Sequence, residues 1–262
     1  MRIDLHNHTF LCNHASGSID EYILKAIDLG INVYGFSCHA PMRFDEKYRM
    51  KLEELETYCK MIADAKERYK GKIEILLGLE VDFIEGKKNL IEKSVLECQS
   101  DYLIGSIHFL DEWGFDNPEF MGEYAKKNLE ECWINYLNAI KKMAQSKFFQ
   151  IVGHFDLLKI FGHKPSTNIK PYLQETLQSI KDSEMVLEIN AAGLRKPIKE
   201  QYPNLEILKY AKKIGIPITF GSDAHNLDEV GFGYEDCVKI AKEAGYQKAI
   251  FFRNKLPYSL SF

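Results

Sequence analysis

The chain has 262 residues, of which 45% are hydrophobic, and its formal net charge is −4 at pH 7. This length is close to the roughly 250 residues of a typical α/β barrel, and the hydrophobic content suits a globular protein with a substantial core. The acidic balance argues against a nucleic-acid or anionic-membrane partner, and no apolar run approaches the roughly 20 residues that a membrane span requires.

Short apolar stretches alternate with amphipathic segments along the chain. We expect strands over residues 3–5, 33–37, 73–81, 102–107, 149–153, 185–190 and 218–221, with a further short one over 249–253. We expect helices over residues 18–30, 51–69, 87–97, 122–144, 170–181, 204–213 and 234–244. A capping box, Ser18-Ile-Asp-Glu21, opens the first helix, and Gly30 and Gly215 end the first and the sixth.

The strict alternation of strands and helices, without a linker or a repeat, predicts parallel strands in one α/β domain over residues 1–262. Seven strand–helix units favour a barrel over an open sheet. No GxGxxG turn follows the first strand, so the usual pattern of a dinucleotide-binding domain is missing.

The six cysteines are scattered, at positions 12, 38, 59, 98, 132 and 237, and none belongs to a CxxC pair. This pattern is typical of reduced thiols in an intracellular protein and not of a disulfide framework. The first residues do not combine a basic segment with an apolar one, so no signal peptide is expected. We therefore expect a cytoplasmic protein.

Histidines and carboxylates gather where the predicted strands end. His6 and His8 follow the first strand, His39 the second, His108 the fourth, His154 the fifth and His225 the seventh, with Glu80 near the end of the third strand and Asp223 beyond the seventh. His14 lies a few residues beyond the same edge, and His163 is expected to be an ordinary loop residue. The carboxyl ends of the strands are where a barrel builds its active site.

A lone loop histidine is usually just a solvent-exposed side chain, and a glutamate at a strand end is usually solvated or salt-bridged, but the joint placement of these residues favours a metal site. Histidine and carboxylate without paired thiolates suit zinc, manganese or iron. Cys12 and Cys38 are near enough in sequence to ligate zinc, although the set is complete without them. Metal-free acid–base catalysis beside Ser37 or Ser222 is the alternative, but no GxSxG motif supports it.

The ordered motifs resemble the PHP (polymerase and histidinol phosphatase) family, in particular its histidinol-phosphate phosphatase branch. They are HxH at 6–8, His14, SCHAP from Ser37, GLE ending at Glu80, GSIHF around His108, GHFD around His154 and GSDAH ending at His225. The similarity extends from Arg2 to about Gly233. The HxH motif alone is common, whereas the ordered set is specific.

The resemblance implies a distorted TIM-like (β/α)7 barrel that holds three divalent metal ions, with zinc expected and manganese or iron as alternatives. His6, His8, Glu80 and Asp223 would hold the first ion, Glu80, His108 and His154 the second, and His14, His39 and His225 the third. Glu80 would bridge the first two ions. Two close ions can supply a bridging hydroxide at neutral pH and neutralise phosphoryl oxygens, which gives Glu80 and Asp223 catalytic roles.

Cations near the metals are expected to bind the phosphate. Arg195, after the sixth strand, is the first choice and Lys159 the second, while Arg43 is a further candidate. Family members commonly carry arginine near the Lys159 position, so this chain departs from the family pattern there. A solvated surface charge is the alternative for each. The proton donor for the leaving group is left open among a metal-bound water, Asp223 and a nearby histidine.

The leading functional hypothesis is hydrolysis of L-histidinol phosphate in histidine biosynthesis. The alternatives are a PHP phosphoesterase acting on nucleotides or nucleic-acid ends, and a non-enzymatic metal-binding module. The expected binding partner is a small phosphate monoester, and the sequence does not decide whether the chain forms a homo-oligomer. The stretch 108–120 places aromatic residues among carboxylates that suit an imidazole and an ammonium group, namely Phe109, Trp113 and Phe115 among Asp111, Glu112 and Asp116. A loop whose aromatics merely cap the barrel is the alternative.

Overall fold

A sheet of seven parallel strands forms the centre of the computed structural model, which describes the backbone of residues 1–262 and every side chain except that of Thr167. The strand order is β1-β2-β3-β4-β7-β8-β9. Their bounds are β1 Ile3–Asp4, β2 Val33–Phe36, β3 Glu74–Asp82, β4 Tyr102–Ser106, β7 Ile151–Val152, β8 Val186–Asn190 and β9 Ile218–Gly221. Every neighbouring pair is parallel. Nearly all residues of these strands are buried, as in a parallel sheet covered on both faces.

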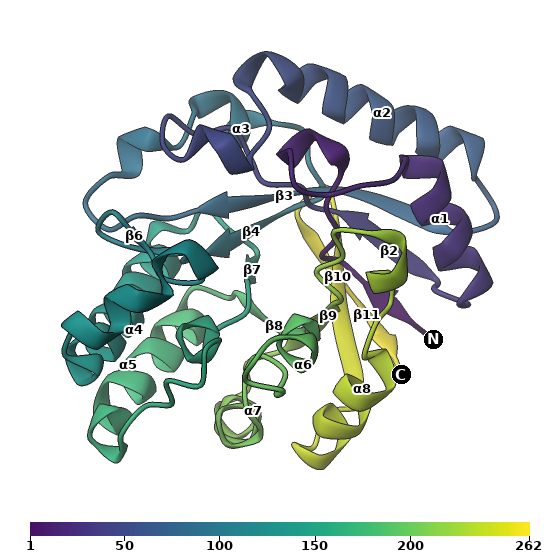
Figure 1. Cartoon of the computed structure of the whole chain (residues 1–262). Coiled ribbons are helices and arrows are strands. Elements are labelled where there is room, and N and C mark those ends of the chain that lie inside the picture. The colour runs from purple at the N-terminus through teal and green to yellow at the C-terminus, as the bar shows by residue number, and fades with distance from the viewer.

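The two outer strands of this sheet, β1 and β9, meet and nearly close it into a barrel. The amide of Leu5 donates to the carbonyl of Phe220 at 2.9 Å, and the amide of Asp223 donates to the carbonyl of His6 at 2.7 Å. Figure 1 shows the strands at the centre with helices around them. The prediction of a TIM-like α/β barrel in one domain is thus confirmed.

The helices follow the predicted order. The α-helices are α1 Ile19–Asp28, α2 Leu55–Arg68, α3 Lys93–Glu97, α4 Leu129–Ser146, α5 Lys170–Asp182, α6 Ala192–Arg195, α7 Leu205–Ile214 and α8 Tyr234–Glu243. The 3-10 helices are η1 Phe10–Cys12, η2 Glu46–Tyr48, η3 Leu52–Glu54, η4 Lys88–Leu90, η5 Pro118–Lys126, η6 Leu157–Lys159, η7 Thr167–Ile169 and η8 Leu227–Glu229. The predicted capping box is present, because Ser18 and Glu21 each accept a hydrogen bond from the other's amide. Gly215 ends α7 with φ of 87°, a left-handed conformation that glycine adopts without strain. No described helix is both long and apolar enough to cross a membrane.

Three local features differ from the sequence-based expectations. The helix predicted over 122–144 begins at Leu129, because Asn128 caps it by accepting hydrogen bonds from the amides of Glu130 and Glu131. The segment before it forms η5 and, beyond β4, a small hairpin of β5 (Phe109–Leu110) and β6 (Trp113–Gly114). The short helix α6 after β8 was not predicted.

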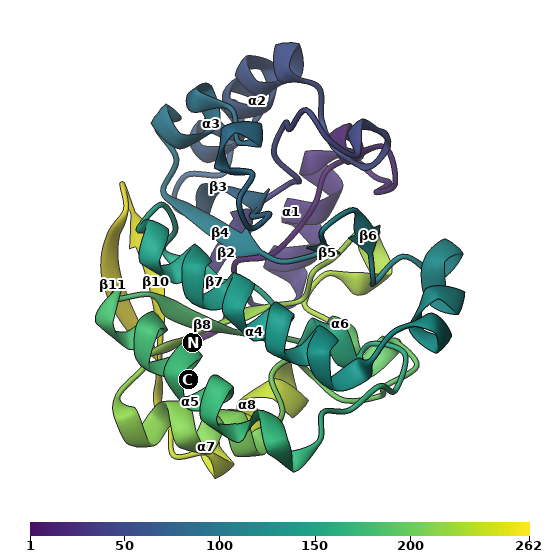
Figure 2. The same ribbon diagram turned by 90° about the vertical axis from the view of Figure 1, so that its left-hand side faces the viewer.

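A hairpin of β10 (Lys248–Arg253) and β11 (Leu256–Ser261) follows the barrel. Of these two strands, only β10 was predicted. Its turn reaches the amino ends of β3 and β4, where Arg253 pairs with Glu74 at 2.5 Å and the amide of Lys255 donates to the carbonyl of Asp101 at 2.8 Å. Figure 2 shows the two termini side by side, and the amino group of Met1 donates to the carbonyl of Ser261 at 3.1 Å. The hairpin therefore lies at the end of the barrel opposite the carboxyl ends of the strands.

The barrel interior depends on two glycines that face one tyrosine. The hydroxyl of Tyr102, a fully buried residue of β4, donates to the carbonyl of Leu5 at 2.5 Å. A Cβ atom added at Gly35 would lie 2.0 Å from the Tyr102 hydroxyl oxygen, and one added at Gly78 would lie 2.4 Å from its ring. Only a residue without a side chain fits at these positions of β2 and β3.

We expect Gly78→Ala to destabilise the protein by about 2 kcal/mol or more, because the new methyl group must displace the buried Tyr102 ring. Urea unfolding of the metal-loaded protein measures the change. Gly122→Ala is the matched control, since an added Cβ there meets no heavy atom within 4 Å. Equal unfolding midpoints for the two variants would contradict this description of the interior.

Candidate metal centre

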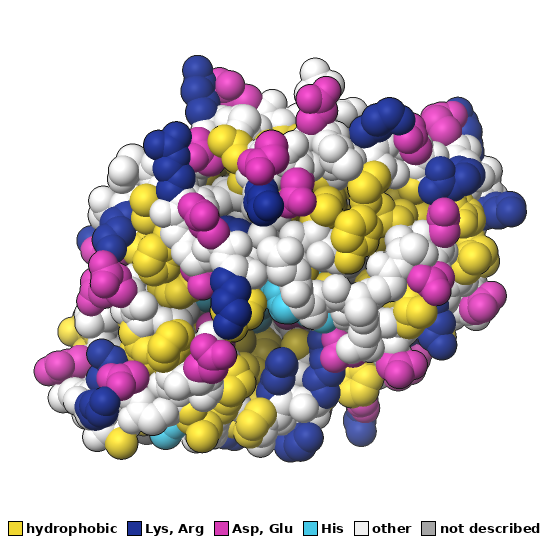
Figure 3. Space-filling model, turned by 45° about the horizontal axis from the view of Figure 1, so that its top comes forward, with side chains coloured by type: hydrophobic (Ala, Val, Ile, Leu, Met, Phe, Trp, Pro, Cys, Tyr) yellow, Lys and Arg dark blue, Asp and Glu magenta, His cyan; other side chains and the backbone are white. Residues whose placement is uncertain are grey.

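The carboxyl ends of the parallel strands bring together the nine expected metal ligands. They come from the segments after β1 (His6, His8, His14), β2 (His39), β4 (His108), β7 (His154) and β9 (Asp223, His225), and from β3 itself (Glu80). Backbone bridges extend the barrel up to the site, because Asn7 pairs with Ala224 and His39 with Glu80. Figure 3 shows histidine side chains near the middle of one face, with hydrophobic, acidic and basic side chains around them.

The carboxylate of Glu80 is the centre of the cluster. Its Oε2 atom lies 3.3 Å from Nε2 of His6 and 3.0 Å from Nδ1 of His39. Its Oε1 atom lies 2.9 Å from Nε2 of His154 and 3.5 Å from Nε2 of His108. The two oxygens of one buried carboxylate thus face two different groups of imidazoles, which is the arrangement that a ligand shared by two metal ions needs.

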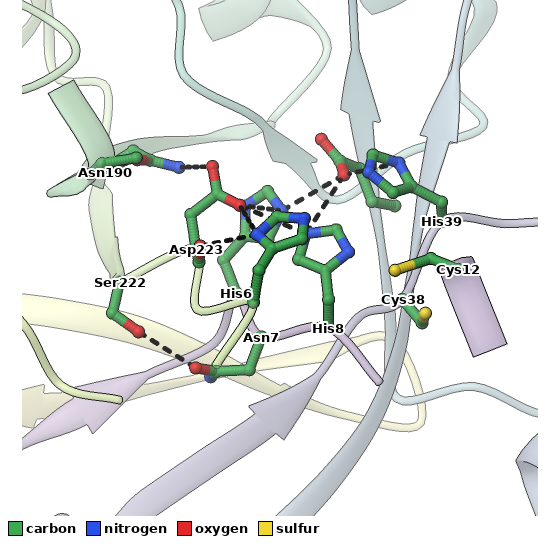
Figure 4. Close-up of polar contacts among 12 residues, drawn as sticks. His6, Asn7, His8, Cys12, Cys38, His39, Asn190, Ser222 and Asp223 are labelled. Atoms are coloured by element: carbon green, nitrogen blue, oxygen red, sulfur yellow. Dashed lines mark hydrogen bonds and ion pairs between the residues drawn. The ribbon is translucent and has the colours of Figure 1, made fainter. Parts of the chain in front are cut away.

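Asp223 approaches the same cluster from the opposite strand. Its Oδ1 atom lies 3.2 Å from Nε2 of His8 and 3.8 Å from Nε2 of His6, while its Oδ2 atom accepts a hydrogen bond from Asn190 at 3.1 Å. Figure 4 shows these side chains turned toward one another. Asp223 has φ of 57°, a left-handed conformation that is uncommon outside glycine and is often found at functional sites.

His14, His39 and His225 form the outer part of the cluster. The ring centroid of His14 lies 4.7 Å from that of His225 and 5.3 Å from that of His39, and His225 stacks on His8 at 3.9 Å. Two other groups of three residues also have possible ligand atoms within 4.8 Å of one another. One group is His39, Glu80 and His108, and the other is Cys12, His14 and His225. The structure thus brings the expected third set together but does not separate it sharply from the other two.

Three residues that support the cluster were missed in the sequence. Glu188, in the middle of β8, accepts a hydrogen bond from Nδ1 of His6 at 2.7 Å, and Asp82, at the end of β3, accepts one from Nδ1 of His108 at 2.6 Å. Such carboxylates fix the ring orientation of a ligating histidine. The buried Arg49 in turn pairs with Asp82 at 2.9 Å. An acidic residue inside an otherwise apolar strand, as in Val186-Leu-Glu-Ile-Asn190, was the available signal for Glu188.

Burial and mutual charge shift the pKa values of this cluster strongly. Burial alone would raise the pKa of Glu80, but His6, His39 and His108 bring it well below its usual range. Burial opposes the charged form of His8 and His108 too, yet neighbouring carboxylates raise the pKa of His8 to about 9 and that of His108 to about 10. Burial lowers the pKa of His225 to about 3, and His8 adds to this effect. Close, buried groups with opposing shifts are typical of functional sites.

Several buried nitrogens of the cluster have no hydrogen-bond partner within the described part of the chain, among them Nε2 of His6, His8 and His225. A buried polar atom without a partner is costly in free energy. Imidazole nitrogens that converge with carboxylate oxygens match the donor set of zinc and related divalent cations. The residues present therefore fit divalent metal ions.

The cluster lies at the floor of a cavity of about 460 Å³. Arg195, at the end of α6, lines this cavity, and its guanidinium group also donates to the carbonyl of Ser222 at 2.8 Å and to that of Asp223 at 2.5 Å. Asp116 and Phe109 line the wall beyond β4. The predicted cation Arg195 therefore lines the cavity, but only two of the six residues expected from the stretch 108–120 do so. Trp113 and Phe115 are buried in the core, and Asp111 and Glu112 are exposed outside the cavity lining.

The other predicted cations lie elsewhere. Lys159 is buried in η6, outside the lining of the cavity, and its amine already contacts Glu200 at 2.6 Å and Asp156 at 2.8 Å. Arg43 is exposed and pairs with Glu92 at 2.6 Å. Local charge pairing in the folded chain occupies both cations, and sequence alone did not reveal these pairs.

Comparison with known proteins places this geometry in a family. The model of the PHP domain matches residues 4–192, and that of the PHP-associated region matches residues 201–238. A protein of Deinococcus radiodurans named "Probable histidinol-phosphatase" is 38% identical over 97% of both chains. The histidinol-phosphatase of Bacillus subtilis is 30% identical over 88% of this chain and 96% of its own. A crystal structure of the Lactococcus lactis histidinol phosphate phosphatase, complexed with zinc, L-histidinol and phosphate, is 23% identical, covers 98% of both chains and has the same fold, with a TM-score of 0.84.

We expect Glu188→Gln to weaken metal binding by roughly 10- to 100-fold, because the neutral amide holds the His6 ring less firmly and lowers its basicity. Competition with a chromophoric chelator measures the affinity of the first zinc ions bound. Glu175→Gln, at an exposed position that pairs with Lys141, is the control and should bind metal as the wild type does. Unchanged affinity in Glu188→Gln would remove Glu188 from the metal site.

Proposed function

The chain belongs to the PHP family, and from this premise we propose that it is a metal-dependent phosphatase that hydrolyses L-histidinol phosphate to L-histidinol and phosphate. The observation that carries the proposal is the convergence of the nine expected ligands around the Glu80 carboxylate, where seven of them line one cavity and His6 and His8 are buried beside it. The Deinococcus and Bacillus relatives, which match along nearly their whole length, bear the name of this activity. The Lactococcus structure was solved with both products and zinc.

The proposal includes three divalent metal ions, with zinc as the expected metal. His6, His8, Glu80 and Asp223 would hold one ion, Glu80, His108 and His154 the second, and His14, His39 and His225 the third. The distances from the two oxygens of Glu80 support its role between the first two. Bound divalent cations supply Lewis acidity, which activates water at neutral pH and neutralises charge on the phosphoryl oxygens.

The protein's own side chains would orient the phosphate. Arg195 lines the cavity next to Asp223, and its planar guanidinium group can bind two phosphate oxygens at once. Its hydrogen bonds to the carbonyls of Ser222 and Asp223 hold it in place, and they also fix the backbone that carries Asp223. Lys159 is left out of the phosphate site, because it is buried outside the cavity lining with Asp156 and Glu200 against its amine. Arg195 also has an acidic partner, since its Nε lies 3.1 Å from Glu229, but both of these residues line the cavity.

Selectivity for histidinol would come from the wall beyond β4. Asp116 lines the cavity, whereas Asp82 and not Asp116 is the carboxylate that accepts the hydrogen bond from Nδ1 of His108. Burial raises the pKa of Asp116, whereas the charges of His108 and His154 lower it. An ammonium or imidazolium group of the substrate would pair with this carboxylate, with the ring of Phe109 lining the same cavity.

We expect Arg195→Ala to lower kcat/KM for L-histidinol phosphate by tenfold or more, which corresponds to about 1.4 kcal/mol of transition-state binding. The loss follows from removing the charge that faces the phosphate. Phosphate-release kinetics measure it, and elemental analysis of the same samples shows whether metal content has changed. Wild-type kinetics would exclude Arg195 from the substrate site. If the variant instead lost metal but kept its activity per bound metal, the role of Arg195 would be only to hold the backbone of Asp223.

We expect L-histidinol phosphate to have a higher kcat/KM than nucleoside monophosphates or a plain aryl phosphate, since the metals can act on any monoester and the walls must discriminate. Asp116→Asn should lower kcat/KM for L-histidinol phosphate by more than it lowers the value for the aryl phosphate. Asp111→Asn is the control, at an exposed loop position with φ of 58° that asparagine tolerates. If a nucleotide had a kcat/KM about tenfold higher than that of L-histidinol phosphate, the histidinol assignment would be wrong and the nucleotide phosphoesterase alternative would take its place.

A further inference from the structure

Two cysteines from different helices lie in contact outside the metal site. Cys59 belongs to α2 and Cys98 directly follows α3, and their Sγ atoms are 3.3 Å apart although 39 positions separate them in the sequence. Both residues are partly exposed, whereas Cys12, Cys38, Cys132 and Cys237 are buried. Solvent-borne reagents therefore have access to this pair more readily than to the other four thiols.

The surrounding packing holds the two thiols in this position. Tyr58 and Ile62 anchor α2 in the core, and Val95 does the same for α3. The turn of the β10–β11 hairpin contacts α3, because the amine of Lys255 donates to the carbonyl of Leu96 at 3.3 Å. The pair thus lies on the side of this hairpin, toward the amino ends of the strands and away from the metal ligands.

The environment of the pair favours a reactive thiolate at Cys98. The hydrogen bond from Cys59 and the positive charge of Lys255 lower the pKa of the Cys98 thiol, against the opposing effect of burial. The same contact with Cys98, together with burial, raises the pKa of Cys59. A thiolate beside a cation and within reach of a second thiol is the arrangement of a reactive dithiol pair.

We propose that Cys59 and Cys98 form a reversible disulfide when the protein meets a low-molecular-weight disulfide such as oxidised glutathione. The Cys98 thiolate attacks one sulfur of the oxidant, forms a mixed disulfide and releases one glutathione thiolate. Cys59 then loses its proton to solvent and attacks Sγ of Cys98, which releases the second glutathione thiolate. The protein loses two electrons, and the oxidant is reduced to two thiols.

The bond would close a loop around the strand that carries the centre of the metal site. The segment between Cys59 and Cys98 contains all of β3, including Glu80 and Asp82. The sulfur atoms must approach from 3.3 Å to about 2.05 Å, a small movement for two helix side chains. Closing a loop of this length restricts the unfolded chain, so the oxidised protein should be more resistant to unfolding.

The test treats the reduced, zinc-loaded full chain with oxidised glutathione, alkylates the remaining thiols and maps its peptides without reduction. We expect one cross-linked species joining the Cys59 and Cys98 peptides, with the other four cysteines alkylated after denaturation. The melting temperature should rise by about 5 °C or more and return to its starting value with dithiothreitol. Phosphatase activity assayed on the same samples measures whether the disulfide changes the metal site.

Cys59→Ser and Cys98→Ser are the paired variants, and each should abolish both the cross-link and the dithiothreitol-sensitive rise in melting temperature. Circular dichroism and zinc content confirm that both remain folded. Recovery of Cys59 and Cys98 as separate alkylated peptides, or as stable glutathione adducts without a cross-link, would overturn the proposal. A disulfide between Cys12 and Cys38 in their place would overturn it as well.

Discussion

One buried carboxylate, that of Glu80, organises the site. Its two oxygens face different imidazoles, with His6 and His39 on one side and His108 and His154 on the other. A carboxylate amid so many imidazoles in a buried site is stable only when charges are balanced, because burial alone opposes ionisation of both kinds of group. Several imidazole nitrogens around it have no hydrogen-bond partner in the described part of the chain, and divalent cations, whose donor set they match, would complete this balance.

The barrel makes this convergence possible. Parallel strands end at the same edge, so short segments after β1, β2, β4, β7 and β9 deliver side chains from residues far apart in the sequence. The junction of β1 with β9 matters most, because the amide of Asp223 bonds to the carbonyl of His6 and fixes the two ligands against each other. Gly35 and Gly78 leave room for Tyr102 beneath, which keeps the strands in register under the site.

The sequence predicted the barrel because the fold depends on a pattern along the chain, namely seven apolar stretches that alternate with helices. Six of these stretches have a histidine or carboxylate at or just beyond their carboxyl end, so the sequence also indicated which side chains the fold brings together. It could not reveal pairings between distant segments. Glu188 lies in an apolar strand and becomes relevant only through its hydrogen bond to His6. Lys159 was a candidate for binding phosphate, and only the fold shows that its amine pairs with Glu200, 41 positions later in the sequence. The predicted start of α4 at residue 122 was wrong, because the side chain of Asn128 caps the helix and it begins at Leu129.

In the proposed three-metal site, Glu80 would lie between two of the ions. Anomalous diffraction from crystals of the zinc-loaded protein, recorded on both sides of the zinc absorption edge, tests this arrangement most directly. We expect three anomalous peaks per chain, two of them flanking the Glu80 carboxylate and the third among His14, His39 and His225. A single peak, or two peaks of which neither lies within bonding distance of Glu80, would contradict this arrangement.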